Sequence, residues 1–214
     1  MATTTPNYGW TVPTSTDLVK DGATAIETLG DAIDASMNTA LGTKKAMGVL
    51  LTTVSFSAVA SQAINSVFSA TYENYQIVLK VVGSTGPIGL NLRMRVAGVS
   101  ASGSDYRFGN HFVTGGGVEG VESSSNSATS ASLGSSMYTA SYFSNQRIEI
   151  FQPFLTERTT GVLQSVHPRD SNGFLNATCY GGFFHNLATS YDGFELLTST
   201  GTMTGNVSVY GYNK

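Results

Sequence analysis

The sequence predicts a mainly β protein in which a short extended segment and one helix precede an antiparallel, jelly-roll-like β-sandwich. Helical periodicity of apolar residues occurs only near the N-terminus. From about residue 49, runs of β-branched and aromatic residues alternate with Gly, Ser, Asn and Asp. About ten such runs without intervening helical patterns are typical of a sandwich. We therefore expect two segments, residues 1–48 and residues 49–214.

The composition favours a folded chain with a weakly charged surface. Charged residues make up 12% of the 214 residues, about half of the usual share, whereas 11 Phe and 10 Tyr are available for a core. The net charge is −3 and basic residues are scattered, so we expect no nucleic-acid partner. The single cysteine, Cys179, excludes an intrachain disulfide. No run approaches the ~18 apolar residues of a membrane span, so we expect no membrane insertion.

Residues 1–16 contain Pro6, Pro13 and several threonines, a mixture that favours extended conformations. Within them, three large residues alternate with small or polar neighbours, so a bound strand would point all three at one groove. A frayed tail is the alternative interpretation. The expected contacts to a partner surface are Tyr8, Trp10 and Val12.

A helix is predicted at about residues 17–41, where apolar residues recur at steps of three and four. Gly22 and Gly30 lie inside it, and an isolated helix of this length is marginally stable in water. We therefore expect self-association as a short coiled coil, with packing against the β domain as the alternative. The expected oligomer seam contains Val19, Ile26, Leu29 and Ile33.

The region beyond residue 49 is predicted to consist of strands. Residues 90–96 alternate apolar and polar side chains, which buries one face and leaves Asn91, Arg93 and Arg95 on the other. The Gly- and Ser-rich residues 115–136 are either a surface loop or an edge ribbon. The best strand candidates are residues 63–68, 75–82, 89–97, 106–114, 137–143, 147–151, 161–167, 176–184, 193–198 and 205–212.

No catalytic or metal motif is recognisable in the chain. The three histidines, His111, His167 and His185, have no carboxylate or second histidine at metal-ligand spacing. A glycan-cleaving enzyme needs two carboxylates beside the scissile bond, and no motif places two acidic residues together. We therefore expect no enzymatic activity, no metal and no cofactor.

Ligand binding has better support, because a tyrosine ring stacks on a sugar while its hydroxyl forms a hydrogen bond. Several aromatic residues are predicted near loops or strand ends, where a ligand could reach them. Ordinary core and rim positions are the alternative. The candidate receptor-binding residues are Tyr106, His111, Tyr138, Tyr142, Tyr180 and Tyr191.

Residues 13–34, PTSTDLVKDGATAIETLGDAID, resemble the N-terminal segment of many tail fibre and minor tail proteins of tailed bacteriophages. Residues 56–57 and 65–75 also resemble the start of β domains in phage fibre proteins. The resemblance implies a virion protein, assembled in the host cytoplasm, whose N-terminus attaches to other tail or baseplate proteins. It also implies a homotrimer, although Ile at a with Leu at d would by itself suit a dimer.

The resemblance leads to three functional hypotheses. The first is a homotrimeric tail fibre whose β domain contacts a host-surface glycan or receptor. The second is a purely architectural tail, neck or capsid-decoration protein without receptor binding. The third is a glycan depolymerase.

Overall fold

The protein is described by a computed structural model that covers residues 3–14, 19–43, 48–138, 143–168 and 176–213. In these residues it is mainly β with a single α-helix, which confirms the predicted fold class. The chain divides into two compact units, residues 1–46 and 47–214, close to the expected boundary after residue 48.

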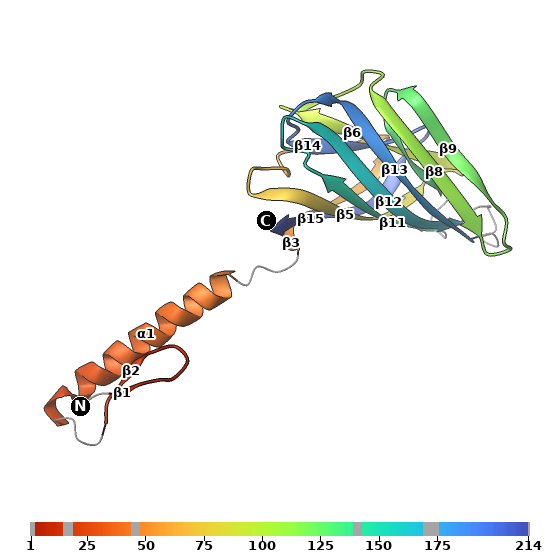
Figure 1. Ribbon diagram of the computed structural model, residues 1–214. Helices are drawn as coiled ribbons and strands as arrows, with labels where there is room; N and C mark the ends of the chain where they lie inside the picture. Colours follow the sequence, from red (N-terminus) through yellow and green to blue (C-terminus); the bar gives the residue numbers. More distant parts are fainter. Residues whose placement is uncertain (1–2, 15–18, 44–47, 139–142, 169–175, 214) are drawn as a thin grey trace. The chain divides into compact units, whose positions relative to one another are not determined.

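The N-terminal unit pairs a small hairpin with one helix. Strands β1 (Thr3–Thr4) and β2 (Thr11–Val12) are antiparallel neighbours. After a 3₁₀ turn at Val19–Asp21, helix α1 runs over Gly22–Thr43, close to the predicted residues 17–41. Figure 1 shows the hairpin lying along α1, which β2 contacts.

An eight-stranded antiparallel sheet forms one layer of the β unit, counted over the described residues. Its strand order is β3-β15-β5-β11-β12-β13-β8-β9. In that order the strands span Val49–Val59, Met203–Asn213, Tyr72–Gly83, Ser144–Phe151, Arg158–Pro168, Asn176–Ala188, Tyr106–Thr114 and Glu119–Ala128.

A smaller antiparallel sheet forms the second layer, visible in Figure 1 at β6 and β14. Its strand order is β10-β6-β14-β4, and β7 pairs with β6 at the side. These strands span Ala131–Met137, Ile88–Val96, Gly193–Thr198, Ser61–Ile64 and Val99–Ser100 respectively.

One hydrophobic core joins the two sheets. The alternation predicted at residues 90–96 is present, because β6 buries one side chain in two and leaves its arginines on the outer face. Burying an apolar side chain of this size contributes roughly 1.5–3 kcal/mol. The two facing layers are therefore held as a sandwich-like arrangement, whereas its jelly-roll connectivity stays a prediction. Core members include Ile77, Leu79, Leu90, Leu92, Ile148 and Ile150.

Most predicted strands are present, with shifted ends. Residues 106–114 and 193–198 have the bounds predicted for them. The prediction for 63–68 was partly wrong, because β4 ends at Ile64. The prediction for 137–143 was wrong at residues 138 and 143, because β10 ends at Met137 and β11 begins at Ser144; residues 139–142 lie outside the described residues. Within residues 115–136, the edge-ribbon alternative is confirmed by β9, the last strand of its sheet.

Candidate functional site

A row of polar and aromatic side chains crosses the outer face of the eight-stranded sheet. On β11, Ile148 and its apolar neighbours face the core, so Arg147 and Glu149 face outward. Register then places Arg147 opposite Gln164 on β12, and Gln164 opposite Tyr180 on β13. Side chains in such directly opposed positions are close enough to act on the same ligand.

Tyr180 and His111 form a hydrogen-bonded aromatic pair at one end of this row. They are opposite each other on β13 and β8, and the Tyr180 hydroxyl lies 2.9 Å from His111 Nδ1. Their ring centroids are 5.3 Å apart, and 48% of Tyr180 is exposed. The structure thus brings together two of the predicted receptor-binding residues and leaves a ring surface accessible.

Arg147 and Glu149 form an ion pair next to that aromatic pair. Arg147 Nη2 lies 2.6 Å from Glu149 Oε1, and this contact raises the pKa of Arg147. With its amide in the orientation that satisfies its neighbours, Gln76 accepts from Arg147 Nε at 2.6 Å and from the Tyr212 hydroxyl at 2.9 Å. The guanidinium is therefore held in place while its side chain remains 56% exposed.

These side chains surround a shallow cavity of about 620 Å³, here called the first hollow. Beside it, Val162 on β12 lies opposite Gly182, which in turn lies opposite Gly109 on β8, so no side chain rises from the sheet at these two positions. A Cβ added at Gly109 would meet nothing within 4 Å. An apolar floor with polar walls suits a ligand that has both kinds of surface. The residues that line the first hollow include Arg147, Glu149, Val162, Gln164, Tyr180 and Gly181.

A second hollow of about 460 Å³ adjoins the first on the same face. Arg147 and Gln164 line both hollows, so they form the wall between them. Sequence reasoning missed Arg147, Glu149 and Gln164. The alternation of residues 144–151 shows that Arg147 and Glu149 share one face of their strand. The sequence does not show that this strand pairs with the strand that carries Gln164.

Three other predicted receptor-binding residues are core residues, so their prediction was wrong. Tyr106 and Tyr191 are 0% and 1% exposed, and Tyr138 is 8% exposed. The Tyr106 hydroxyl accepts from the Met94 amide at 2.8 Å and donates to the Ala101 carbonyl at 3.0 Å. Its polar end is therefore satisfied inside the fold. The sixth candidate, Tyr142, lies outside the described residues.

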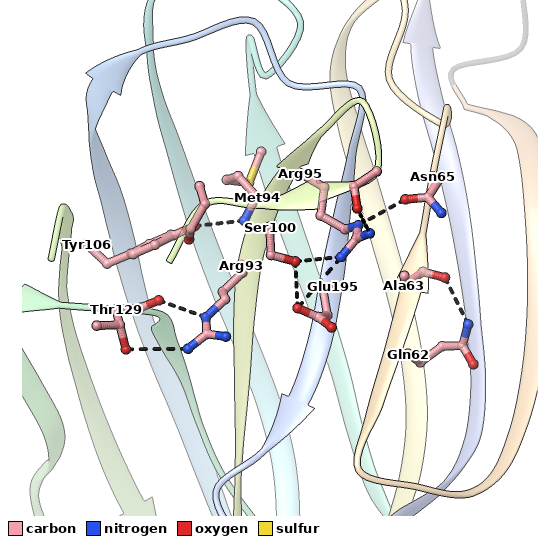
Figure 2. Close-up of polar contacts among 12 residues, drawn as sticks. Gln62, Ala63, Asn65, Arg93, Met94, Arg95, Ser100, Tyr106, Thr129 and Glu195 are labelled. Atoms are coloured by element: carbon pink, nitrogen blue, oxygen red, sulfur yellow. Dashed lines mark hydrogen bonds and ion pairs between the residues drawn. The ribbon is translucent and has the colours of Figure 1, made fainter. Parts of the chain in front are cut away.

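A second charged cluster lies on the smaller sheet, and Figure 2 shows it at Arg95. Arg95 donates to Ser100 Oγ at 2.5 Å, to Asn65 Oδ1 at 2.9 Å and to the Gly98 carbonyl. Glu195 Oε2 lies 3.9 Å from Arg95 Nη1 and accepts from Ser100 Oγ at 2.7 Å. The Arg95 side chain is only 13% exposed. We assign this cluster to joining β6, β7 and β14, because its donors are already used within the fold.

The expected attachment residues lie in the hairpin of the N-terminal unit. Trp10 donates from Nε1 to Ser36 Oγ of α1 at 2.9 Å, and its ring stacks on Tyr8 with centroids 5.1 Å apart. Val12 belongs to β2. Tyr8 is 69% exposed, so it is the most accessible of the three for a partner surface.

The expected oligomer seam differs in exposure along its length. Val19 and Ile26 are 96% and 66% exposed. Leu29 and Ile33 are half-buried within the unit. The exposed half of the seam is the part that remains available to another chain.

Among the described residues, no three His, Cys, Asp or Glu side chains gather in a group that could hold a metal ion. No helix in the same residues combines the length and apolarity needed to cross a membrane.

Comparisons with known proteins add little to this geometry. No protein-family model matches the chain, and no curated protein matches it. Among solved structures, the crystal structure of galectin LEC-6 from Caenorhabditis elegans is similar at 9% identity and a TM-score of 0.20. That match covers 72% of this chain and 96% of the galectin. A similarity this small supports no conclusion about fold or function.

Proposed function

We propose that the chain is a homotrimeric structural fibre protein of a tailed bacteriophage that adheres to a host-surface glycan. The N-terminal unit attaches it to other tail or baseplate proteins. The β unit meets the glycan through the first hollow. The observation that carries the adhesive role is the exposed Tyr180–His111 pair at one end of the row and the Arg147–Glu149 pair at the other, with Gln164 between them and the apolar Val162 beside it.

A pyranose ring has apolar C–H faces and a rim of hydroxyls, and the first hollow offers a complement to both. The exposed ring of Tyr180 supplies a stacking surface. Arg147 supplies donors in a fixed fork, and the Glu149 carboxylate supplies acceptors for hydroxyls. The Gln164 amide between them offers a donor and an acceptor.

The virion assignment rests on the resemblance of residues 13–34 to phage fibre proteins. The exposed apolar side chains of Val19 and Ile26 agree with an oligomer, because contact with another chain would remove their apolar surface from water. Three copies of a shallow site suit adhesion, since linked sites gain avidity without tight individual binding.

An architectural role is the second candidate, and one observation favours it. Val78, Val162 and Val166 on the same outer face are 42%, 47% and 52% exposed. Such valines would suit a contact with another virion protein. A depolymerase has less support, because Glu149 is the one acidic residue among the described residues that line the first hollow, and glycoside hydrolysis ordinarily uses two.

Labelling of intact virions separates the two main candidates. An antibody raised against the β unit is applied to particles of the phage that encodes the chain, and the gold label is located by electron microscopy. Adhesion predicts label at the tail tip or on fibres that leave it. Label on the head or along the tail tube would move the architectural role to first place.

A further inference from the structure

We propose that the second hollow binds the acidic residue of a negatively charged oligosaccharide, while the first hollow binds a neutral neighbouring residue. This inference rests on the proposed glycan adhesion and specifies its ligand. It concerns the same outer face of the eight-stranded sheet, where the two hollows share a wall.

The charge of the second hollow is the first reason. None of the described residues that line it is acidic, and its cationic side chains are Lys80 and Arg147. Arg147 is already neutralised by Glu149 at 2.6 Å. Among the described residues that line this hollow, Lys80 is therefore the cation without a neighbouring carboxylate, and an anionic ligand is its complement.

The position of the Lys80 ammonium is the second reason. Its Nζ lies 4.0 Å from the ring centroid of Phe143, a cation–π contact that steadies the side chain. The ring face attracts the ammonium without supplying a negative charge. The N–H groups that point away from the ring can therefore still donate to a carboxylate ligand.

The neighbours of Lys80 across the sheet are the third reason. Register places Asn145 of β11 on one side of Lys80 and Asn206 of β15 on the other. All three side chains are exposed on the outer face. Two amide groups beside an ammonium form a row of hydrogen-bond donors, which is the arrangement that a carboxylate needs.

The first hollow has the opposite preference. A carboxylate placed beside Arg147 there would also lie near Glu149, whose like charge repels it. A neutral ring avoids that cost and can still stack on Tyr180. Since Arg147 and Gln164 line both hollows, consecutive residues of one chain would occupy them.

The test uses the full-length protein on paired oligosaccharides. Bacterial-type oligosaccharides of a few residues that contain uronic acid, sialic acid or a pyruvate ketal are arrayed, each beside its neutral methyl ester. We expect the acidic forms to bind about tenfold more tightly at low salt, as one charge-assisted contact suggests. Raising the salt concentration should reduce this preference through screening.

Two variants locate the preference. Lys80→Gln should bring the acidic and ester forms to within about twofold of each other, because it removes the charge and keeps a polar side chain. Arg107→Gln is the control, since Arg107 is exposed on β8, four strands away from β5 in the same sheet, and its loss changes the net charge equally. The control should retain the full preference for acidic forms.

Each outcome decides the matter. Equal binding of acidic and ester forms that depends on Tyr180 would overturn this inference and keep glycan adhesion. A preference for acidic forms that survives Lys80→Gln would also overturn it. Absence of binding to every arrayed oligosaccharide would overturn the inference together with the proposed adhesion.

Discussion

Tyr180 keeps about half of its surface exposed because β13 alternates its side chains between two environments. Cys179 faces the core and is fully buried, so the next residue faces solvent. The hydrogen bond to His111 then limits the freedom of the Tyr180 ring. A ring that is already ordered loses less entropy when a ligand stacks on it.

Removing this ring should weaken glycan binding. Aromatic stacking contributes about 0.5–1.5 kcal/mol, so Tyr180→Ala should raise the Kd per site roughly two- to tenfold. Tyr210→Ala is the matched control, because Tyr210 is a partly exposed tyrosine of the same sheet outside both hollows. Calorimetric titration with a glycan that binds the wild type gives both values, and equal losses in the two variants would argue against the site.

His185 should make the stability of the β unit sensitive to acid. It is fully buried, its Nδ1 lies 3.1 Å from the Tyr191 hydroxyl, and burial lowers its pKa more than Asp105 raises it. The unfolded chain, with an ordinary histidine pKa of about 6.5, takes up the proton first as pH falls. The free energy of unfolding is therefore highest above pH ~6.5, where His185 is neutral in both states. It falls as the pH drops below ~6.5, because protonation then favours the unfolded chain.

Urea unfolding at a series of pH values between about 7.5 and 5 measures this effect as the slope of the unfolding free energy against pH. His185→Gln should be less stable at neutral pH and should show a shallower slope below pH ~6.5. A slope that the substitution leaves unchanged would show that His185 is not responsible.

For single residues, the sequence identified side chains that can bind a sugar, but it did not show which of them point toward solvent. It identified Tyr180 and His111 as candidates, but it grouped them with Tyr106 and Tyr191, which are buried. Which face of a strand lies inward depends on the partner sheet, and local composition does not specify that.

At the scale of elements, strand β10 depends on a glycine that no other residue could replace without strain. Gly134 has φ +55°, and a Cβ added there would lie 2.5 Å from Cys179 Sγ and 2.9 Å from Asn110 Cβ. Close approach of β10 to the larger sheet therefore requires a residue without a side chain.

Gly134→Ala should lower the unfolding free energy strongly, whereas Gly117→Ala should lower it little. Both positions have positive φ, so each alanine costs about 1 kcal/mol for its backbone conformation. Only Gly134→Ala adds crowding, worth about a further 1–3 kcal/mol, because a Cβ at Gly117 would meet nothing within 4 Å. Chemical denaturation of both variants measures the difference. Equal losses would contradict the close packing of β10.

Strands with strong alternation were predictable from the sequence, and strands without it were not. Residues 106–114 and 193–198 carry aromatic and apolar residues at the spacing that burial requires, and both matched. Strand β9 is serine-rich and lies at a sheet edge, and none of its side chains is buried in the core. Its strand character comes from pairing with β8, which composition alone does not encode.

At the scale of the whole molecule, assembly should depend on the exposed half of the helix seam. Ile26→Asp should shift a trimer toward monomer, because a lone carboxylate buried between helices is costly. Asn38→Asp is the control, since Asn38 is exposed on the same helix and acquires the same charge. Sedimentation velocity at micromolar concentration reports both. A wild-type monomer that keeps its helical signal, or equal dissociation of both variants, would contradict the seam.

Adhesion through the outer face of the eight-stranded sheet is the central claim, and a competition for phage adsorption tests it most directly. Host cells are incubated with purified full-length protein before the phage that encodes the chain is added, and unadsorbed particles are counted. Wild-type protein should reduce adsorption, and a variant with both Arg147→Ala and Tyr180→Ala should not, because it lacks the fork of donors and the stacking ring. Equal inhibition by both proteins, or none by the wild type, would contradict the claim.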